Sequence, residues 1–149
     1  MSKFVLACAL AAATLLPAMA LPGLAQAQPD PIAERKAGLK RMAGHMEAIK
    51  AILDGGGNAA PVAERAADMA GFFRGLPALF PPGSGQGDTK ATAAIWSDRA
   101  GFEAAAANAA AAATRLQQAA TGGDAAAINT AFRETGAACG TCHRGYRAR

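Results

Sequence analysis

The sequence has few aromatic residues, few histidines and few cysteines. Aromatic side chains make up 5% of the 149 residues, and there are two histidines and three cysteines. A structural zinc site usually takes four cysteine or histidine ligands, and this shortage argues against one. The net charge is +4, but the lysines and arginines form no run and are not interleaved with aromatic residues. This pattern argues against nucleic-acid binding, and we expect no nucleic-acid partner.

A clear strand-like alternation of polar and apolar residues is absent after residue 27, whereas four stretches have helical periodicity. They are residues 31–53, 60–75, from 97 or 98 to 122, and 124–146. In the third stretch the apolar face is formed by Phe102, Ala105, Ala109, Ala112 and Leu116. Residues 80–88, rich in glycine and proline, form a longer connection between the second and third stretches. This order predicts an all-α fold, an antiparallel four-helix bundle.

The N-terminus has the pattern of an export signal. Lys3 precedes an apolar run over residues 4–16, and residues 25–27 have the small-x-small pattern of a signal-peptidase site. Pro17 and Pro22 interrupt the segment too early for a membrane span. We therefore predict a cleaved signal peptide at residues 1–27 and a single mature domain at residues 28–149, located in the periplasm and without a membrane span.

Cys8 lies inside this segment and is interpreted as a small apolar residue that is removed with the signal peptide. Only two cysteines then remain, in the sequence Cys139-Gly140-Thr141-Cys142-His143. This is the attachment pattern of haem c. Two cysteines three residues apart on a helix point the same way, so each sulfur can add to one of two neighbouring vinyl groups of a porphyrin. His143 then projects its imidazole towards the iron.

The cysteine pair has two other interpretations. A thioredoxin-like redox pair needs a strand–helix context, which this sequence lacks. A plain disulfide between Cys139 and Cys142 remains open, because the export signal directs the chain to an oxidising compartment. The signal also leads to the compartment in which haem c is attached, and this favours one covalent haem c.

The motif lies in the last helix, seven residues from the end of the sequence. Together with the bundle, this arrangement resembles the cytochrome c prime family, the class II c-type cytochromes, over essentially the whole mature chain. The resemblance rests on motifs in matching order: Arg35-x-x-x-Leu39; Gly83-Ser84-Gly85 followed by Asp88-Thr89-Lys90; Ile95-Trp96-Ser97-Asp98; and Cys139-x-x-Cys142-His143-x-x-Tyr146-Arg147.

The resemblance implies a role for each of several residues. His143 is the proximal iron ligand, Leu39 covers the distal side of the iron, and Arg147 borders the proximal pocket. Arg35, Lys36 and Asp88 are expected on the propionate side of the haem, where the family commonly has a glutamine at the position of Lys36. Phe80 and Trp96 are candidate walls of the haem pocket.

Leucine has no lone pair to donate, so Leu39 implies a five-coordinate, high-spin iron. An apolar distal pocket offers no hydrogen bond to polarised dioxygen, whereas nitric oxide and carbon monoxide bind ferrous haem without such help. The resemblance further implies that nitric oxide can loosen the bond to His143 and end near Arg147, and that the protein is a homodimer packed through its first two helices. We expect a binding protein rather than an enzyme, because no general acid or base is predicted over the open face of the iron.

The alternative is a periplasmic electron-transfer cytochrome with a redox partner protein. Met42 and Met46 share the helix face of Leu39, and either could be a sixth iron ligand, although methionines at helical spacing more often fill a core. His45 lies about 120° around the helix from Leu39 and is not expected to ligate iron.

Overall fold

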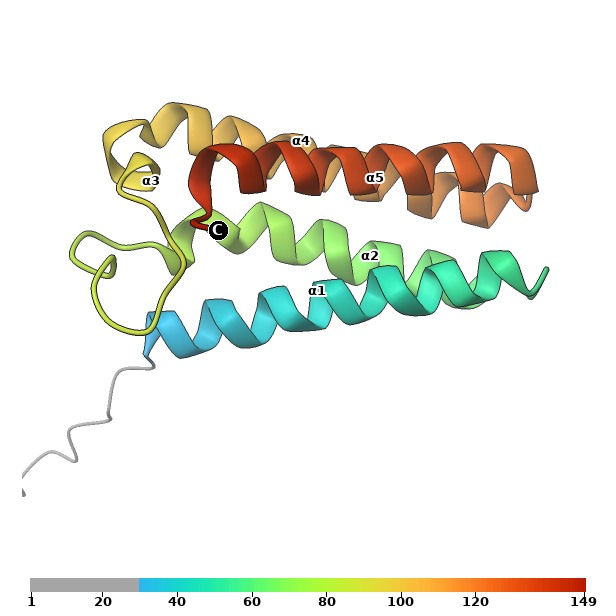
Figure 1. The fold of residues 1–149 in the computed structure, drawn as a ribbon. Coiled ribbons are helices and arrows are strands. Elements are labelled where there is room, and N and C mark those ends of the chain that lie inside the picture. The colour runs from blue at the N-terminus through green and yellow to red at the C-terminus, as the bar shows by residue number, and fades with distance from the viewer. Residues whose placement is uncertain (1–29) are drawn as a thin grey trace, which may run out of the picture.

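The fold is an antiparallel bundle of four long helices, seen in a computed structural model that describes residues 30–149 (Figure 1). The predicted signal peptide lies outside the described residues. α1 and α2 form one layer, and α4 and α5 form the other. The elements are α1 (Pro31–Asp54), α2 (Ala60–Gly75), the 3-10 helix η1 (Leu76–Leu79), the short α3 (Ala94–Ser97), α4 (Arg99–Gly122) and α5 (Ala125–Tyr146). The predicted all-α four-helix bundle is confirmed.

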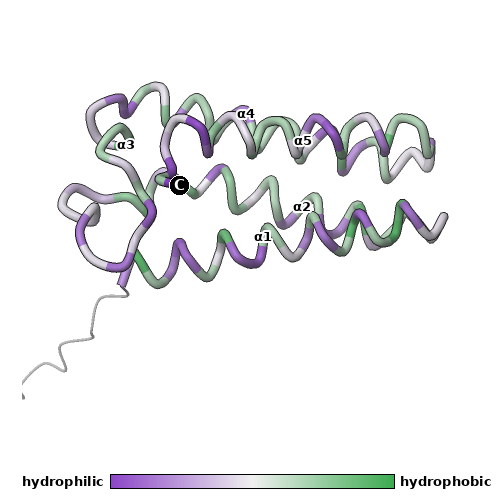
Figure 2. Tube along the Cα trace, in the orientation of Figure 1, coloured by the Kyte–Doolittle hydropathy of each residue, from purple (hydrophilic) through white to green (hydrophobic). Residues whose placement is uncertain are grey.

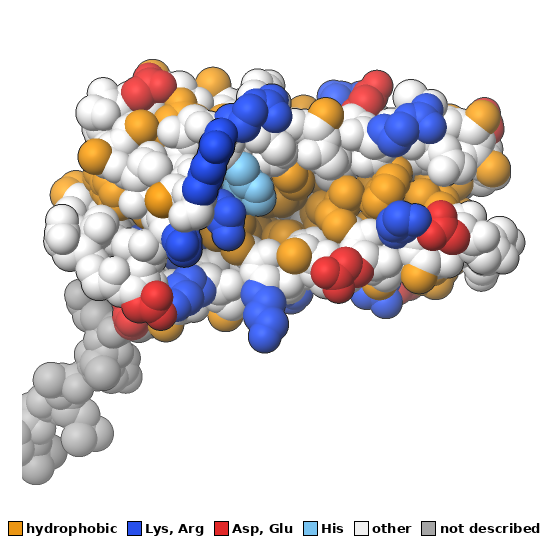
Figure 3. All heavy atoms as spheres, viewed as in Figure 1, with side chains coloured by type: hydrophobic (Ala, Val, Ile, Leu, Met, Phe, Trp, Pro, Cys, Tyr) orange, Lys and Arg blue, Asp and Glu red, His pale blue; other side chains and the backbone are white. Residues whose placement is uncertain are grey.

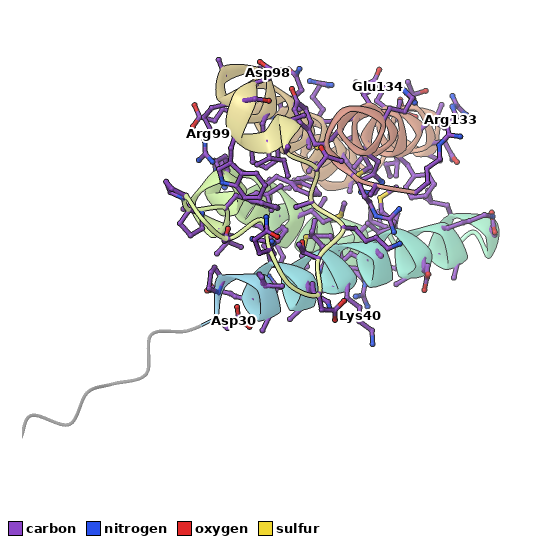
Figure 4. All side chains as sticks on the ribbon, turned by 60° about the vertical axis from the view of Figure 1, so that its left-hand side comes forward. Asp30, Lys40, Asp98, Arg99, Arg133 and Glu134 are labelled. Atoms are coloured by element: carbon purple, nitrogen blue, oxygen red, sulfur yellow. The ribbon has the colours of Figure 1, made fainter. Side chains whose placement is uncertain are left out.

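Aspartates begin three of the long helices. Asp30 accepts a hydrogen bond from the backbone N–H of Ile32 at 2.9 Å, and Asp124 accepts one from Ala126 at 2.9 Å. Asp98 accepts from Gly101 N–H at the start of α4, where Asp98 and Arg99 stand side by side (Figure 4). These carboxylates satisfy N–H groups that have no partner within the helix. The helix boundaries are therefore encoded locally, which is why they could be predicted.

The connection between α2 and α4 contains two short helices that the sequence analysis missed. η1 begins next to Pro77 and continues directly from α2, and α3 occupies four residues immediately before Asp98. Segments of this length do not complete enough turns to show a helical period in the sequence. Asp98, one of the two predicted starting points, is the capping residue of α4.

The part of the core that α4 contributes is built largely from small side chains. Figure 2 shows hydrophobic and hydrophilic residues alternating along each long helix, as expected when one face is buried. Ala106 and Ala113 are buried, whereas Ala105 is only partly buried, so the inner face of α4 is rotated slightly from the predicted line. Alanines allow α4 to approach its neighbours closely, and α4 packs extensively against both α2 and α5.

α1 is held mainly by α2 and η1 and makes almost no contact with α5. One close contact with α2 is at Gly38, where the ring of Phe72 lies against the α1 backbone. Space therefore remains between α1 and α5 that helix–helix packing does not fill. No helix within residues 30–149 is both long enough and apolar enough to cross a membrane.

Gly38 and Gly44, both inside α1, provide a matched test of this contact. A Cβ atom at Gly38 would lie 2.6 Å from Phe72 Cζ, whereas a Cβ atom at Gly44 meets nothing within 4 Å. We expect Gly38→Ala to lower the free energy of unfolding by about 1–3 kcal/mol through overpacking. We expect Gly44→Ala to raise it by about 0.5–1 kcal/mol, because alanine favours the helix. Urea unfolding of both variants checks this, and equal effects would contradict the close approach.

Candidate functional site

A cavity of about 730 Å³ lies where α1 and α5 fail to meet. All four long helices contribute to its walls, together with η1 and residues 88–91. Figure 3 shows hydrophobic side chains gathered in the groove between the two layers, with lysine and arginine side chains around one end of it. A largely apolar hollow of this size lies within the range of about 300–1,000 Å³ that is typical of cofactor sites.

The cysteine motif forms the α5 wall of this cavity. Cys139, Cys142 and His143 all line it, and both cysteines are free and partly buried. Burial raises the pKa of both thiols, and the neighbouring Cys139 raises that of Cys142 further. Within residues 30–149, no group of three or more His, Cys, Asp or Glu side chains is placed to hold a metal ion on its own. The two thiols thus point into a cofactor-sized space.

His143 has electrostatic surroundings that favour its neutral form. Partial burial lowers the pKa of its imidazole, and the positive charge of Arg147 lowers it further. Neutral imidazole is the form that ligates a metal. Arg147 ends α5, donating its backbone N–H to the His143 carbonyl at 3.2 Å, and it lines the cavity. The last turn of α5 is held by a neighbouring segment, because Ala148 N–H donates to the Lys90 carbonyl at 2.8 Å.

α1 supplies a different set of residues to the cavity. Leu39 and Met42 line it, and Met42 is only 3% exposed. Met46 is not part of the lining, and its Cε atom lies close to Gly136 of α5. His45 is turned towards α2, where its Nε2 lies 2.8 Å from Asp68 Oδ2. The two candidate methionine ligands therefore occupy different environments, and only Met42 shares the cavity with His143.

Arg35 is buried at 2% exposure, although a position in the first helix turns could equally have faced solvent. Its Nη1 donates to the Leu79 carbonyl at 3.2 Å and to Ser84 Oγ at 2.9 Å. Its Nη2 donates to the Ser84 carbonyl at 2.7 Å and to Thr89 Oγ1 at 2.9 Å. The guanidinium also lies 4.4 Å above the centre of the Phe80 ring. Arg35 thus ties the loop of residues 80–89 to α1, and it also lines the cavity.

Lys36 and Asp88 lie at the edge of the cavity and form an ion pair with each other. Their side chains are 50% and 96% exposed, so solvent screens the pair. The ammonium of Lys36 lowers the pKa of the Asp88 carboxyl. All three residues expected on the propionate side are therefore brought to one end of the cavity, although the buried Arg35 and the exposed pair bind different partners.

Only one of the two aromatic residues that were expected as walls of the haem pocket lines the cavity. Phe80 lines the cavity and packs edge-on against Phe102, with ring centres 5.0 Å apart. Trp96 is not in the lining; it packs on the outer side of Phe80 and donates from Nε1 to the Pro81 carbonyl at 3.0 Å. Trp96 supports the loop behind the wall.

Several lining residues were not predicted as site residues. Ala106 and Ala109 leave room on the α4 side, Ala91 and Lys90 close one end, and Tyr146 lines the α5 side. The Tyr146 hydroxyl donates to Asp98 Oδ2 at 2.8 Å, which links the end of α5 to the cap of α4. The signal that could have found the α4 residues is the run of alanines itself, since small side chains on an inner face can leave space for a cofactor.

A family model described as Cytochrome C' matches residues 30–147. The chain belongs to the cytochrome c' family. It is 40% identical over 124 residues to the cytochrome c' of Pararhodospirillum photometricum, covering 81% of this chain and 99% of that protein. The crystal structure of cytochrome c' from Thermochromatium tepidum matches with a TM-score of 0.77 at 35% identity, over 84% of this chain and all of that one.

A third relative has been solved with a ligand. It is a mutant cytochrome c prime from Alcaligenes xylosoxidans as its nitric oxide complex, with a TM-score of 0.73 and 28% identity over 80% of this chain and 95% of that one. The predicted family is confirmed by these matches, and with it the cofactor, since cytochromes c' bind one covalent haem c. The site fits that group: two thiols on one helix face and a neutral imidazole border an apolar cavity of adequate size.

Arg35 and its neighbour Lys36 allow a matched test of the loop anchor. Arg35→Gln leaves buried carbonyl and hydroxyl groups without their donor, and we expect it to lower the free energy of unfolding by about 2–4 kcal/mol. Lys36→Gln removes only a screened surface pair and should have little effect. Urea unfolding measures stability, and hydrogen exchange at Ser84 and Thr89 reports the loop. Unchanged exchange in Arg35→Gln would contradict the anchoring role.

Proposed function

We propose that this cytochrome c' is a gas-binding protein of the periplasm, with a five-coordinate, high-spin haem c attached to Cys139 and Cys142. In this proposal His143 is the proximal ligand and Leu39 covers the distal side. The haem supplies an open coordination position at which a diatomic gas binds. The observation that carries the proposal is the composition of the α1 wall, where Leu39 shares the cavity with the cysteine motif of α5.

The polar and apolar residues of the cavity are unevenly distributed. The inner part is lined by Leu39, Met42, Phe73, Leu76 and Ile95, none of which donates a hydrogen bond from its side chain. The charged lining residues come from the first turns of α1, residues 88–90 and the end of α5. An inner lining of this kind favours nitric oxide and carbon monoxide over dioxygen, which needs a hydrogen bond when polarised. The solved nitric oxide complex of the Alcaligenes xylosoxidans relative supports this choice of ligand.

Arg147 is proposed to border the proximal pocket. It lines the cavity beside His143, where burial lowers the pKa of the imidazole and the positive charge of Arg147 lowers it further. No residue in the inner lining is placed as a general acid or base, so we propose binding rather than catalysis.

Export and dimer formation are also part of the proposal. Residues 1–27 would direct the chain to the periplasm. A solved cytochrome c' that is 35% identical to this chain shows ligand-controlled dimer dissociation, which supports a homodimer. Met69 and Phe73 are buried in the core of this chain, so a dimer face on α1 and α2 would use the partly buried Phe72 and the Arg41–Asp68 pair rather than a large apolar patch.

The experiment that tests the proposed function is the visible spectrum of the dithionite-reduced holoprotein before and after addition of carbon monoxide. We expect a broad high-spin spectrum that sharpens with the gas. Sharp, split bands that do not respond to carbon monoxide would contradict the open position.

Leu39→Ala tests the distal cover directly. Removing the isobutyl group should speed carbon monoxide association by about tenfold, which corresponds to a barrier lower by ~1.4 kcal/mol. Met46→Ala, on the same helix but outside the cavity lining, is the control and should leave the rate nearly unchanged. Stopped-flow mixing of the reduced proteins with carbon monoxide measures both rates. An unchanged rate in Leu39→Ala would rule out the cover.

The alternative function, an electron-transfer cytochrome, is favoured by one observation: Met42 is buried in the same cavity as His143. A thioether there could be a sixth ligand. If it is, Met42→Ala should convert a sharp low-spin ferrous spectrum into a broad one. Under the proposed function the ferrous spectrum of Met42→Ala stays high-spin, as in the unaltered protein.

A further inference from the structure

The positive charge of this protein is concentrated at one end of the bundle. Residues 30–149 contain 14 lysines and arginines and 11 aspartates and glutamates. We define the cationic rim as Lys36, Lys40, Lys90, Arg144, Arg147 and Arg149. Asp88 is the acidic residue that pairs with it, so the rim carries a net charge of +5. The other 8 basic and 10 acidic residues together carry −2. The net positive charge of the domain thus comes entirely from the rim.

The rim surrounds the mouth of the cavity. Lys36, Lys40, Lys90 and Arg147 line that mouth, and Lys90 Nζ donates to the Arg149 carbonyl at 3.2 Å. Arg144 lies on the last turn of α5 beside His143. Figure 3 shows these residue types as a band of lysine and arginine side chains across the end of the groove, and Lys40 points outward from α1 in Figure 4. Even with the two propionates of a haem, the rim would keep a charge of +3.

Ion pairs with acidic side chains are more frequent among the other basic residues of the described domain, where four of the eight form one. Arg41, Lys50, Arg99 and Arg115 each form an ion pair with an acidic side chain. Of the rim residues, Lys36 makes such a pair among residues 30–149. Like charges held close together without acidic partners destabilise a fold and create a field that attracts anions. The clustered positive charges of the rim are therefore better explained by binding of an anionic partner than by a contribution to the stability of the fold.

The chemistry of the exposed surface favours a protein partner over a lipid surface. Every exposed apolar residue within residues 30–149 is alanine, glycine or proline. Proteins that lie in a membrane interface insert larger side chains such as Trp, Phe or Leu as well as using basic residues. A concave mouth bordered by flexible cations suits an acidic protein surface, which it attracts over long range and releases quickly.

We propose that the cationic rim is the docking surface of an acidic protein that exchanges electrons with the haem in the cavity. The rim brings the partner to the open edge of the haem site, which both Lys40 and Arg147 line. The partner is thus identified by its negative charge, and this assignment does not depend on which gas the haem binds.

The test uses ferric holoprotein and reduced plant-type [2Fe–2S] ferredoxin as an acidic probe. One electron passes from the ferredoxin cluster to the haem, which is oxidation of the cluster and reduction of the iron with no atom transferred. Stopped-flow absorbance of the haem gives the bimolecular rate constant. We expect it to fall about tenfold or more between low salt and ~0.5 M salt, because salt screens long-range attraction.

A matched pair of double variants separates local from overall charge. Arg144→Gln with Arg149→Gln removes two charges from the rim without altering a cavity-lining residue. Arg133→Gln with Lys50→Gln removes two charges outside the rim, one from the middle of α5 and one from the last turns of α1. Arg133 and Arg144 are equivalent locally, since each donates to the threonine three residues earlier, at 3.3 and 2.9 Å. Eleven residues of helix place them ~16 Å apart.

We expect the rim variant to lower the low-salt rate constant about fivefold to tenfold and the distant variant to lower it less than about twofold. All three proteins should converge at high salt, where the haem's own reactivity is the same. Equal effects of the two double variants, or a rate constant independent of salt, would overturn the proposal. So would binding of the holoprotein to vesicles with 30% phosphatidylglycerol that the rim variant abolishes, since this would assign the rim to a membrane surface.

Discussion

The separation of α1 from α5 is the constraint on which the site depends. A four-helix bundle normally closes its core by packing each helix against its neighbours. Here α4 packs closely on α2 and α5 through alanines, while α1 packs against other helices mainly at α2 and η1. The cavity exists because one of the four helix pairs is left apart. A covalent cofactor suits this arrangement, since the group that fills the gap supplies apolar contact area that the small side chains of α4 lack.

At one end of the open side of the bundle, a loop is held in place by side-chain hydrogen bonds rather than by helix packing. The loop of residues 80–89 has no regular hydrogen-bond ladder, and its polar backbone would be costly to bury without partners. Arg35 donates three hydrogen bonds to it and a fourth to the Leu79 carbonyl just before it, and Trp96 adds one from the other side. Arginine fits this role because its planar guanidinium offers several donors in a fixed geometry and stacks on an aromatic ring. The same side chain therefore orders the loop and forms part of the cavity wall.

The sequence could predict what is encoded locally. The starts of α4 and α5 followed from Asp98 and Asp124, and the ends of α1 and α4 from the glycines after them, because capping involves neighbouring residues only. The attachment motif followed from spacing on one helix. Periodicity could not separate Met42 from Met46, since both lie on the face of Leu39. What separates them is the tilt of α1 relative to α5, which brings Met46 next to Gly136 and leaves Met42 at the cavity.

Burial of Arg35 could not be derived from periodicity for a related reason. An arginine in the first turns of a helix is ordinarily solvated, and its partners here are 44 to 54 residues away. The cationic rim could not be predicted from the sequence either. Lys36, Lys90 and Arg147 are scattered in the sequence and are brought to one end of the cavity only by the fold. A sequence without a basic run can thus still fold into a strongly basic surface. Apolar side chains line the inner cavity while an excess of cations surrounds its mouth, so one geometry can exclude water from the haem and attract an anionic partner to its edge.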